Sequence, residues 1–262
     1  MNESNILITG ASGFIGATLN DLVSAYTPTH RRLDLTNYIK VKQYFKDHSD
    51  IDLTVHCAVA PPKKHEDRAS DEEYGQKIIK DIAMASNILK FSPRTIILTT
   101  GAAKHSDNPD VGWSADVISR LSNSFAPKVL ELRPFGVYGP GEDPKRFPSY
   151  CFKQITHNEP ICVTKDRLMS WIYVDDLCEI IAHFTRVPWH YQWMDVVMPQ
   201  SKSMTEIANM CMGIARTKVE LIVEGTGPDY VGNPLYLYDE IPQIHFTTWD
   251  EGLRRLYETT IF

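Results

Sequence analysis

The stretch ILITGASGFIG, Ile6 to Gly16, decides the fold of this chain. Its first four residues, Ile6–Thr9, are apolar or β-branched, which predicts a short buried strand. Glycines follow at positions 10, 13 and 16, and apolar residues then recur at helical spacing from Ala17 to Val23. A glycine turn between a strand and a helix lets backbone N–H groups approach an anion, and the helix N-terminus adds about half a positive charge. The stretch therefore predicts a pyrophosphate site, with a glycine-rich turn that binds nothing as the alternative.

Strand and helix patterns alternate beyond this stretch. Short apolar runs predict four more strands, at Asp52–Cys57, Thr95–Thr99, Val129–Arg133 and Met194–Met198. Between the first two of these strands, Ile78, Ile82, Ala85 and Leu89 recur three and four residues apart, which gives one apolar face of a helix. This order predicts an α/β fold, a Rossmann-type doubly wound parallel sheet with helices packed on it.

The pattern changes after Arg133. Loops rich in proline and glycine follow, and then shorter helices at Met204–Ile214 and Trp249–Tyr257. We expect two parts: a Rossmann domain over residues 1–135, to which 171–200 return, and a smaller C-terminal α/β substrate lobe over 136–170 and 201–262.

Composition excludes several classes of partner. The chain has 262 residues, a formal net charge of −6 and 43% hydrophobic residues, with no long basic run and no apolar run of membrane-spanning length. We therefore expect neither nucleic acid nor a membrane as a partner. The five cysteines form no CxxC pair, so we expect buried thiols and no metal site. The first residues carry no export signal, which predicts a cytoplasmic location.

Six ordered stretches resemble one family. The GxxGxxG spacing is similar to the short-chain dehydrogenase/reductase superfamily, and later segments resemble its extended, nucleotide-sugar-modifying branch, the NAD-dependent epimerases and dehydratases. These segments are Leu33–Thr36, Val55–Ala60, LRPFGVYGPG at Leu132–Gly141, WIYVDDL at Trp171–Leu177, Ser203–Ile207 and Thr248–Leu253. Two of them also have a structural interpretation: Asp175 and Asp176 as an N-cap with a first-turn acid, and Ser203 with Glu206 as a capping box.

The resemblance implies a nicotinamide dinucleotide, NADP or NAD, and a nucleotide sugar as substrate. The residues that it places on the cofactor are Gly10, Ser12, Gly13, Phe14, Ile15, Asp34, Leu35, Ala58, Val59, Ala60 and Thr99. Only 18 positions separate Gly16 from Asp34, so we expect the second strand of the family to be very short or missing. Arg31 and Arg32 lie where an acidic residue of the family would bind the 2′-hydroxyl of the adenosine ribose in NAD. Guanidinium groups at this place suit the 2′-phosphate of NADP. Two solvated arginines on a loop are the alternative.

The usual catalytic residues of the family are incomplete in this sequence. The resemblance implies a Ser/Thr after Leu98, a YxxxK pair on the next long helix, and an Asn on the preceding one. The strict Ser/Thr position falls on Gly101, which leaves Thr100 or Thr99 as substitutes, and the Asn position falls on Asp81. The best helix before the LRP strand, Trp113–Phe125, contains neither Tyr nor Lys.

We therefore expect a non-standard acid, with Thr100, His105 and Tyr138 as candidates. A Tyr-Lys pair at Tyr38–Lys42 lies on a helix far from the expected nicotinamide end, so we do not expect it to be catalytic. Two functions stay open: an enzyme that epimerises, reduces or dehydrates a nucleotide-linked sugar, and a non-catalytic dinucleotide-binding or regulatory module. The resemblance also leaves a homodimer open. Family members commonly dimerise through the two helices that flank the segment in which the YxxxK pair is expected.

Overall fold

The computed structural model of the chain describes residues 5–60, 71–101 and 109–260. It divides the chain into two compact units. Unit 1 consists of Met1–Arg133 with Cys178–Met194, and unit 2 consists of Pro134–Leu177 with Asp195–Phe262.

The sheet of unit 1 confirms the predicted α/β fold class. Its strand order is β1-β2-β3-β4-β9, and the pairings of β1 with β2, β2 with β3 and β3 with β4 are parallel. The strands are β1 (Ile6–Thr9), β2 (Leu53–His56), β3 (Thr95–Leu98), β4 (Val129–Pro134) and β9 (Trp193–Val196). The parallel strands have their carboxyl ends at one edge, which is where open α/β sheets bind ligands.

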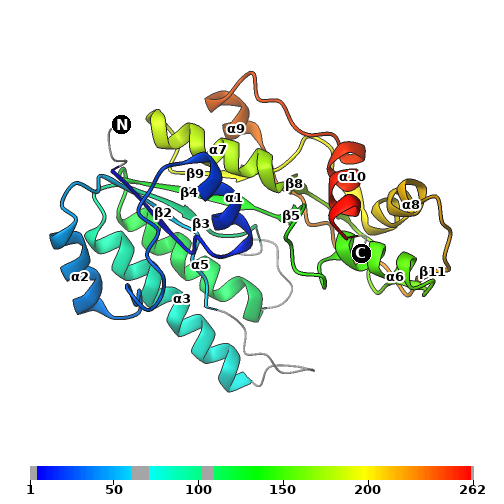
Figure 1. Ribbon diagram of the computed structural model, residues 1–262, viewed down its shortest axis with the longest axis horizontal. Helices are drawn as coiled ribbons and strands as arrows, with labels where there is room; N and C mark the ends of the chain where they lie inside the picture. The colour runs from blue at the N-terminus through cyan, green and yellow to red at the C-terminus, as the bar shows by residue number, and fades with distance from the viewer. Residues whose placement is uncertain (1–4, 61–70, 102–108, 261–262) are drawn as a thin grey trace. The chain divides into compact units, whose positions relative to one another are not determined.

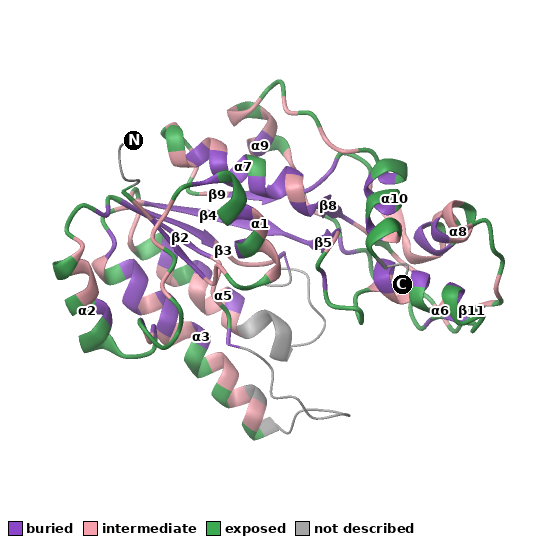
Figure 2. Cartoon of the chain, viewed as in Figure 1, coloured by how far each residue is buried: buried purple, intermediate pink, exposed green. Residues whose placement is uncertain are grey.

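Helices cover both faces of this sheet (Figure 1). They are α1 (Phe14–Leu22), α2 (Tyr38–Asp47), α3 (Asp71–Phe91), α5 (Pro109–Ser124) and α7 (Val174–Arg186). The α3 side chains Met84 and Ile88 pack in one apolar cluster with Leu7 of β1 and Val41 of α2. Figure 2 shows the strands of this sheet as almost continuously buried, as expected for strands covered on both faces.

The connection from α1 to α2 is short. Within the described residues, the β pairing between these helices is limited to one parallel bridge, Leu7 with Tyr26. Ile8 N–H donates to Tyr26 O, and Tyr26 N–H donates to Ile6 O. This confirms the prediction of a very short or missing second strand, because too few residues remain after α1 to build a full one.

Unit 2 has its own core of aromatic and aliphatic side chains. Three two-stranded pairings support it: β5 with β8 and β6 with β11 run parallel, and β7 with β10 runs antiparallel. The strands are β5 (Gly136–Tyr138), β6 (Ile161–Val163), β7 (Leu168–Met169), β8 (Trp171–Tyr173), β10 (Lys202–Ser203) and β11 (Leu221–Val223). The helices are α6 (Phe147–Thr156), α8 (Met204–Ala215), α9 (Leu235–Glu240) and α10 (Trp249–Thr260).

Two helix starts follow the sequence closely. The Ser203 side chain accepts a hydrogen bond from Glu206 N–H, and the Glu206 side chain accepts one from Ser203 N–H, so the predicted capping box is present. Helix α7 begins at Val174, so Asp175 and Asp176 both lie in its first turn and Asp175 is not the N-cap. Among the described helices, none is both long and apolar enough to cross a membrane.

Candidate functional site

The glycine loop joins β1 to α1 at the carboxyl edge of the unit 1 sheet. Gly10 has a φ of +74°, in the left-handed region that favours glycine, and a Cβ there would lie 2.7 Å from the backbone nitrogen of Ala58. A Cβ on Gly16 would collide with the carbonyl oxygen of Gly10. The loop closes on itself through Gly13 N–H, which donates to Gly10 O at 2.9 Å. This path can therefore be followed only with glycine at positions 10 and 16.

The N-terminus of α1 is suited to an anion. Gly13 caps the helix and has no side chain to accept from the first-turn amides. The first turn contains no acidic residue. Ser12 and Gly13 are exposed, whereas Phe14 and Ile15 are half-buried. Free N–H groups and the helix dipole together favour a negatively charged group at this position.

A buried pair of side chains lies at the ends of β1 and β2, beneath the glycine loop. Thr9 and His56 are register partners in adjacent strands, and Thr9 Oγ1 lies 2.7 Å from His56 Nδ1. Burial lowers the pKa of His56 to about 4. The imidazole is therefore neutral at physiological pH, and the pair supports the loop without adding charge.

The Asp34 segment follows the short connection after Tyr26. Asp34 Oδ1 accepts hydrogen bonds from Thr36 Oγ1 at 2.7 Å and from Thr36 N–H at 3.1 Å. The Thr36 hydroxyl is the main cause that lowers the Asp34 pKa. Leu35 is buried, and its carbonyl accepts from Asn87 Nδ2 at 2.8 Å. This bond ties the segment to α3.

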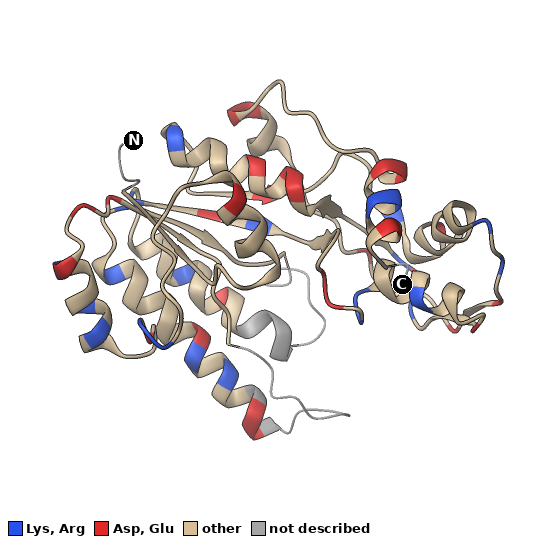
Figure 3. Cartoon of the chain, viewed as in Figure 1, with Lys and Arg blue, Asp and Glu red and all other residues tan. Residues whose placement is uncertain are grey.

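Arg31 and Arg32 are exposed and precede this segment by two to three residues. Thr29 O accepts from Arg32 N–H, so both arginines lie in or beside a tight turn. Basic positions also occur on the neighbouring helix α2 (Figure 3). Both arginines are therefore exposed on a turn that precedes the Asp34 segment.

The loop after β2 is anchored by an acid from α3. Ala60 N–H donates to Asp81 Oδ1 at 2.6 Å, and Lys77 pairs with Asp81 Oδ2 at 2.5 Å. Ala60 is buried, Ala58 is half-buried and Val59 is 68% exposed. Asp81, which occupies the Asn position implied by the resemblance, thus fixes the backbone of the segment expected on the cofactor.

Thr99 lies at the end of β3 and belongs to a buried polar network. Thr99 Oγ1 donates to Glu131 Oε1 at 2.6 Å, while Glu131 Oε2 pairs with Arg133 Nη2 at 2.6 Å. Ser119 of α5 accepts from Arg133 Nη2 and donates to Glu131 Oε2, both at 2.9 Å. The Arg133 guanidinium also stacks on the Trp193 ring at 4.2 Å.

Sequence reasoning missed this network, although a signal was present. Glu131 and Arg133 are two residues apart in an otherwise apolar strand, and such residues point to the same face. Both are buried, with exposed fractions of 0% and 2%. Because a buried charge needs a partner, two opposite charges at this spacing could have predicted the ion pair.

The catalytic candidates lie in different places. Thr100 is half-buried and directly follows Thr99 at the carboxyl edge of the unit 1 sheet, and Gly101 beside it is buried. His105 lies outside the described residues. Helix α5 contains neither Tyr nor Lys along its length, so it carries no YxxxK pair.

Tyr138 is not placed to act on a substrate. Its side chain is fully buried in the unit 2 core, stacked on Trp249 with ring centroids 4.9 Å apart. Burial raises the pKa of its phenol far above the ordinary value. The catalytic interpretation of Tyr138 is corrected accordingly, because a phenol without exposed surface cannot reach a substrate.

The two acids of the WIYVDDL stretch hold unit 2 together. Asp176 accepts from Thr247 N–H at 2.8 Å and from Thr247 Oγ1 at 2.7 Å. Asp175 lies 3.6 Å from an Arg255 guanidinium nitrogen. These contacts give both acids a structural role, although Asp175 is not the N-cap that the sequence predicted.

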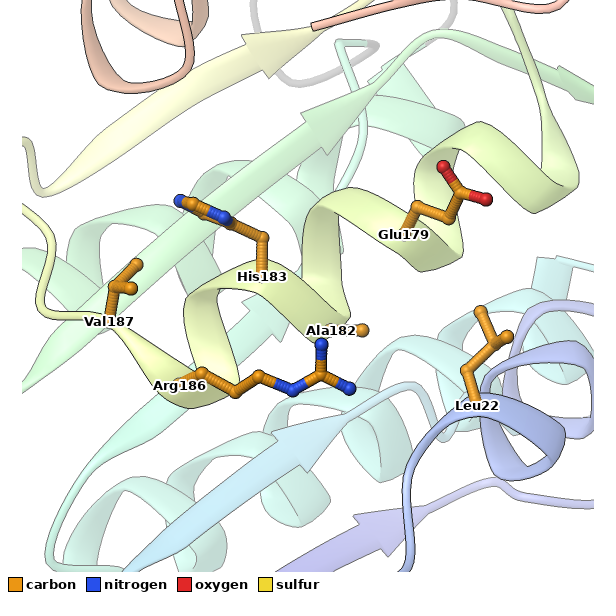
Figure 4. Close-up of a pocket in the computed structure, with 6 residues that line it drawn as sticks. All are labelled: Leu22, Glu179, Ala182, His183, Arg186 and Val187. Carbon is orange, nitrogen blue, oxygen red and sulfur yellow. The ribbon is translucent and has the colours of Figure 1, made fainter.

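A concavity of about 390 Å³ lies between the end of α1 and α7 (Figure 4). Its lining residues are Leu22, Glu179, Ala182, His183, Arg186 and Val187. None of them belongs to the glycine loop or to the carboxyl edge of the sheet, so this concavity is not the predicted cofactor site. In the described part of the chain, no group of three or more His, Cys, Asp or Glu side chains is arranged to hold a metal ion.

Comparison with known proteins agrees with this fold. A sequence model of the NAD dependent epimerase/dehydratase family matches residues 115–190, which include the LRPFGVYGPG and WIYVDDL stretches. The predicted resemblance to this family is confirmed. No curated protein sequence matches the chain.

Solved structures of similar fold cover nearly the whole chain. GDP-mannoheptose C4 reductase from Campylobacter jejuni, solved with NADP bound, has a TM-score of 0.79 at 16% identity over 97% of this chain and 96% of its own. UDP-glucose 4-epimerase from Thermotoga maritima, solved with UDP-glucose, has a TM-score of 0.78 at 15% identity over 97% of both chains. dTDP-4-dehydrorhamnose reductase from Bacillus anthracis, in complex with NADP, has a TM-score of 0.75 at 20% identity over 97% of this chain and 98% of its own. At these identities, the likeness establishes that the chain shares the fold of these structures.

Proposed function

We propose that this chain binds NADP or NAD at the carboxyl edge of the unit 1 sheet and epimerises, reduces or dehydrates a nucleotide-linked sugar. The single observation that carries the proposal is the glycine loop, in which two glycines have no room for a side chain and lead into a helix N-terminus without a side-chain cap. The bound NADP and UDP-glucose named for the similar structures support the same ligand classes.

We infer the order in which a dinucleotide would contact the residues of unit 1 along the sheet edge. The pyrophosphate would lie on Gly10, Ser12, Gly13, Phe14 and Ile15 at the start of α1. The adenosine end would meet Asp34 and Leu35, with Arg31 and Arg32 available to a 2′-phosphate. Ala58, Val59, Ala60 and Thr99 would follow toward the nicotinamide end. The cofactor supplies hydride transfer when bound; this chain binds and orients it.

Catalysis would use an unusual acid. Thr100 is the candidate hydroxyl next to Thr99, and His105 is the candidate proton carrier from the sequence. Losing a positioned acid or base typically costs about 10²–10⁴ in rate, so we expect slow turnover compared with an enzyme that has the Tyr-Lys pair.

Binding is tested first, by calorimetric titration with NADPH and NADH. Gly13→Ala places a Cβ 3.3 Å from Gly10 O, at the uncapped start of α1. We expect it to weaken binding by about tenfold or more, the equivalent of one hydrogen bond to a charged group. Gly213→Ala is the matched control, because nothing lies within 4 Å of a Cβ at that position in α8. Unchanged affinity in Gly13→Ala would argue against this loop as the site.

Turnover is tested separately, with NAD(P)(H) and a panel of UDP-, dTDP-, GDP- and CDP-linked sugars. Hydride transfer or epimerisation that is abolished by Thr100→Val or His105→Ala would support the enzyme. Tight cofactor binding with no altered sugar would instead support the non-catalytic module.

Two further properties are part of the proposal. A cytoplasmic location would place the chain with free nucleotide sugars and reduced cofactors. The second property is a homodimer. Sedimentation at micromolar concentration would distinguish it from a monomer.

A further inference from the structure

The hydroxyl of Thr99 has a fixed polarity. A threonine hydroxyl has one hydrogen to donate and two lone pairs that accept. In this structure the hydrogen is directed to Glu131 Oε1, at 2.6 Å. Thr99 is half-buried and lies directly after β3, at the carboxyl edge of the sheet. Toward any ligand at the carboxyl edge of the sheet, Thr99 therefore presents only lone pairs.

Glu131 is held in the state that keeps this polarity. It is fully buried, pairs with Arg133 at 2.6 Å and accepts from Ser119 Oγ at 2.9 Å. Both carboxylate oxygens of Glu131 accept hydrogen bonds, Oε1 from Thr99 and Oε2 from Arg133 and Ser119. A carboxylate that is surrounded by donors in this way acts only as an acceptor. Glu131 cannot donate to Thr99, so the direction of the Thr99 bond cannot reverse.

The family resemblance implies a Ser/Thr hydroxyl in this stretch that polarises the reacting carbonyl, and the polarity of Thr99 does not suit that role. Polarising a carbonyl requires a hydrogen-bond donor, and Thr99 has none to spare. A group that only accepts instead selects an N–H or O–H donor on the ligand.

We propose that Glu131 fixes Thr99 as a hydrogen-bond acceptor for the carboxamide N–H of the nicotinamide ring, which selects the orientation of that ring. The inference rests on the proposed cofactor. A ribose hydroxyl can donate or accept and is indifferent to the polarity of Thr99. The carboxamide has a donor end and an acceptor end, so a fixed acceptor distinguishes between them. Thr99 is then a cofactor contact, and Glu131 is a positioning residue.

The test compares NADPH with its acetylpyridine analogue, which keeps the carbonyl oxygen but has no amide N–H. Dissociation constants are measured by calorimetry for the wild type, Thr99→Ser and Thr99→Val. We expect the wild type and Thr99→Ser to prefer NADPH by about tenfold, the value of one hydrogen bond to a polarised acceptor. Thr99→Val should reduce the preference to about twofold or less.

A ligand without the nicotinamide ring controls for the fold. 2′-Phospho-ADP-ribose should bind the wild type and Thr99→Ser with equal affinity, and Thr99→Val with a similar one, since it lacks the carboxamide. Equal binding of NADPH and the analogue by the wild type would overturn the inference, as would a preference that survives in Thr99→Val. If the wild type binds neither NADPH, NADH nor 2′-phospho-ADP-ribose, the proposed function itself is wrong.

Glu131→Gln tests the positioning role directly. A glutamine amide can donate to Thr99, which frees the Thr99 hydrogen, so the preference for the carboxamide should fall while 2′-phospho-ADP-ribose still binds. An undiminished preference in folded Glu131→Gln would contradict the role of Glu131. This variant leaves Arg133 buried without its partner, and if it fails to fold, the Thr99→Ser and Thr99→Val pair decides.

Discussion

In unit 1, the surroundings of single residues determine their pKa values and the direction of their hydrogen bonds. His56 is an example, because burial lowers its pKa to about 4 from an ordinary value of 6.5. Thr99 is another, because its partner Glu131 determines what it can bind. In both cases the neighbours come from another strand, so the residue type alone does not reveal the behaviour.

The lowered pKa of His56 predicts acid sensitivity. Between pH 6.5 and 4 the unfolded chain binds a proton that the folded chain does not, so this contribution to stability is complete above about pH 6.5 and falls as the pH decreases. Its size is about 3 kcal/mol at most, from 1.36 kcal/mol per pKa unit. We expect the stability advantage of the wild type over His56→Asn to shrink as the pH is lowered through this range.

Urea unfolding of both proteins at pH 7, 6, 5 and 4 measures this difference. The comparison with the variant is needed because Glu142 in unit 2 titrates in the opposite sense: burial raises its pKa to about 7, which costs stability as the pH rises. If the difference in unfolding free energy between the wild type and His56→Asn does not change with pH, the burial of a neutral His56 is contradicted.

At the scale of elements, α3 holds the loop after β2. Asp81 is buried, and its Oδ1 accepts from Ala60 N–H at 2.6 Å. Without this acceptor, a buried N–H group is left unpaired, which costs about 1–3 kcal/mol. The bond couples the helix to a segment that the proposed function places along the cofactor.

Asp81→Ala is therefore expected to lower both the stability, by about 1–3 kcal/mol, and the affinity for NADPH. Asp81→Asn is the matched control, because its amide oxygen can still accept from Ala60 and Lys77 is exposed enough to be solvated. Thermal unfolding and calorimetric titration measure the two effects. If Asp81→Asn loses as much affinity as Asp81→Ala, the charge and not the Ala60 bond is what matters.

At the scale of the whole molecule, the proposed preference for NADP over NAD would depend on the exposed turn at Arg31 and Arg32. Arg31→Gln/Arg32→Gln should weaken NADPH binding by about tenfold or more and leave NADH binding unchanged, because only NADPH carries a 2′-phosphate. Lys46→Gln on α2 controls for the loss of positive charge. A wild type that binds NADH as tightly as NADPH would favour the alternative of two solvated arginines.

The strands of unit 1 were easier to predict from the sequence than the packing of side chains in unit 2. The Rossmann strands were predictable because each is a short apolar run bounded by loops. Tyr138 was misread as a candidate acid because it lies in the LRPFGVYGPG stretch that resembles the family. Its side chain packs against Trp171, Tyr173 and Trp249 in the unit 2 core. Those partners are 33 to 111 positions away, so no local pattern could reveal the burial.

By itself the sequence determined the strand, glycine loop and helix at Ile6–Leu22, the short connection after it and the capping box at Ser203. These features are local: they depend on backbone conformations and hydrogen bonds between residues a few positions apart. Only the tertiary structure decided that Thr99 donates to Glu131, 32 positions away, and that Asp81 accepts from Ala60, 21 positions away. The physical reason is that hydrogen-bond direction and burial are set by neighbours. Parallel pairing of β3 with β4 brings Glu131 to Thr99, and the packing of α3 on the sheet brings Asp81 to Ala60.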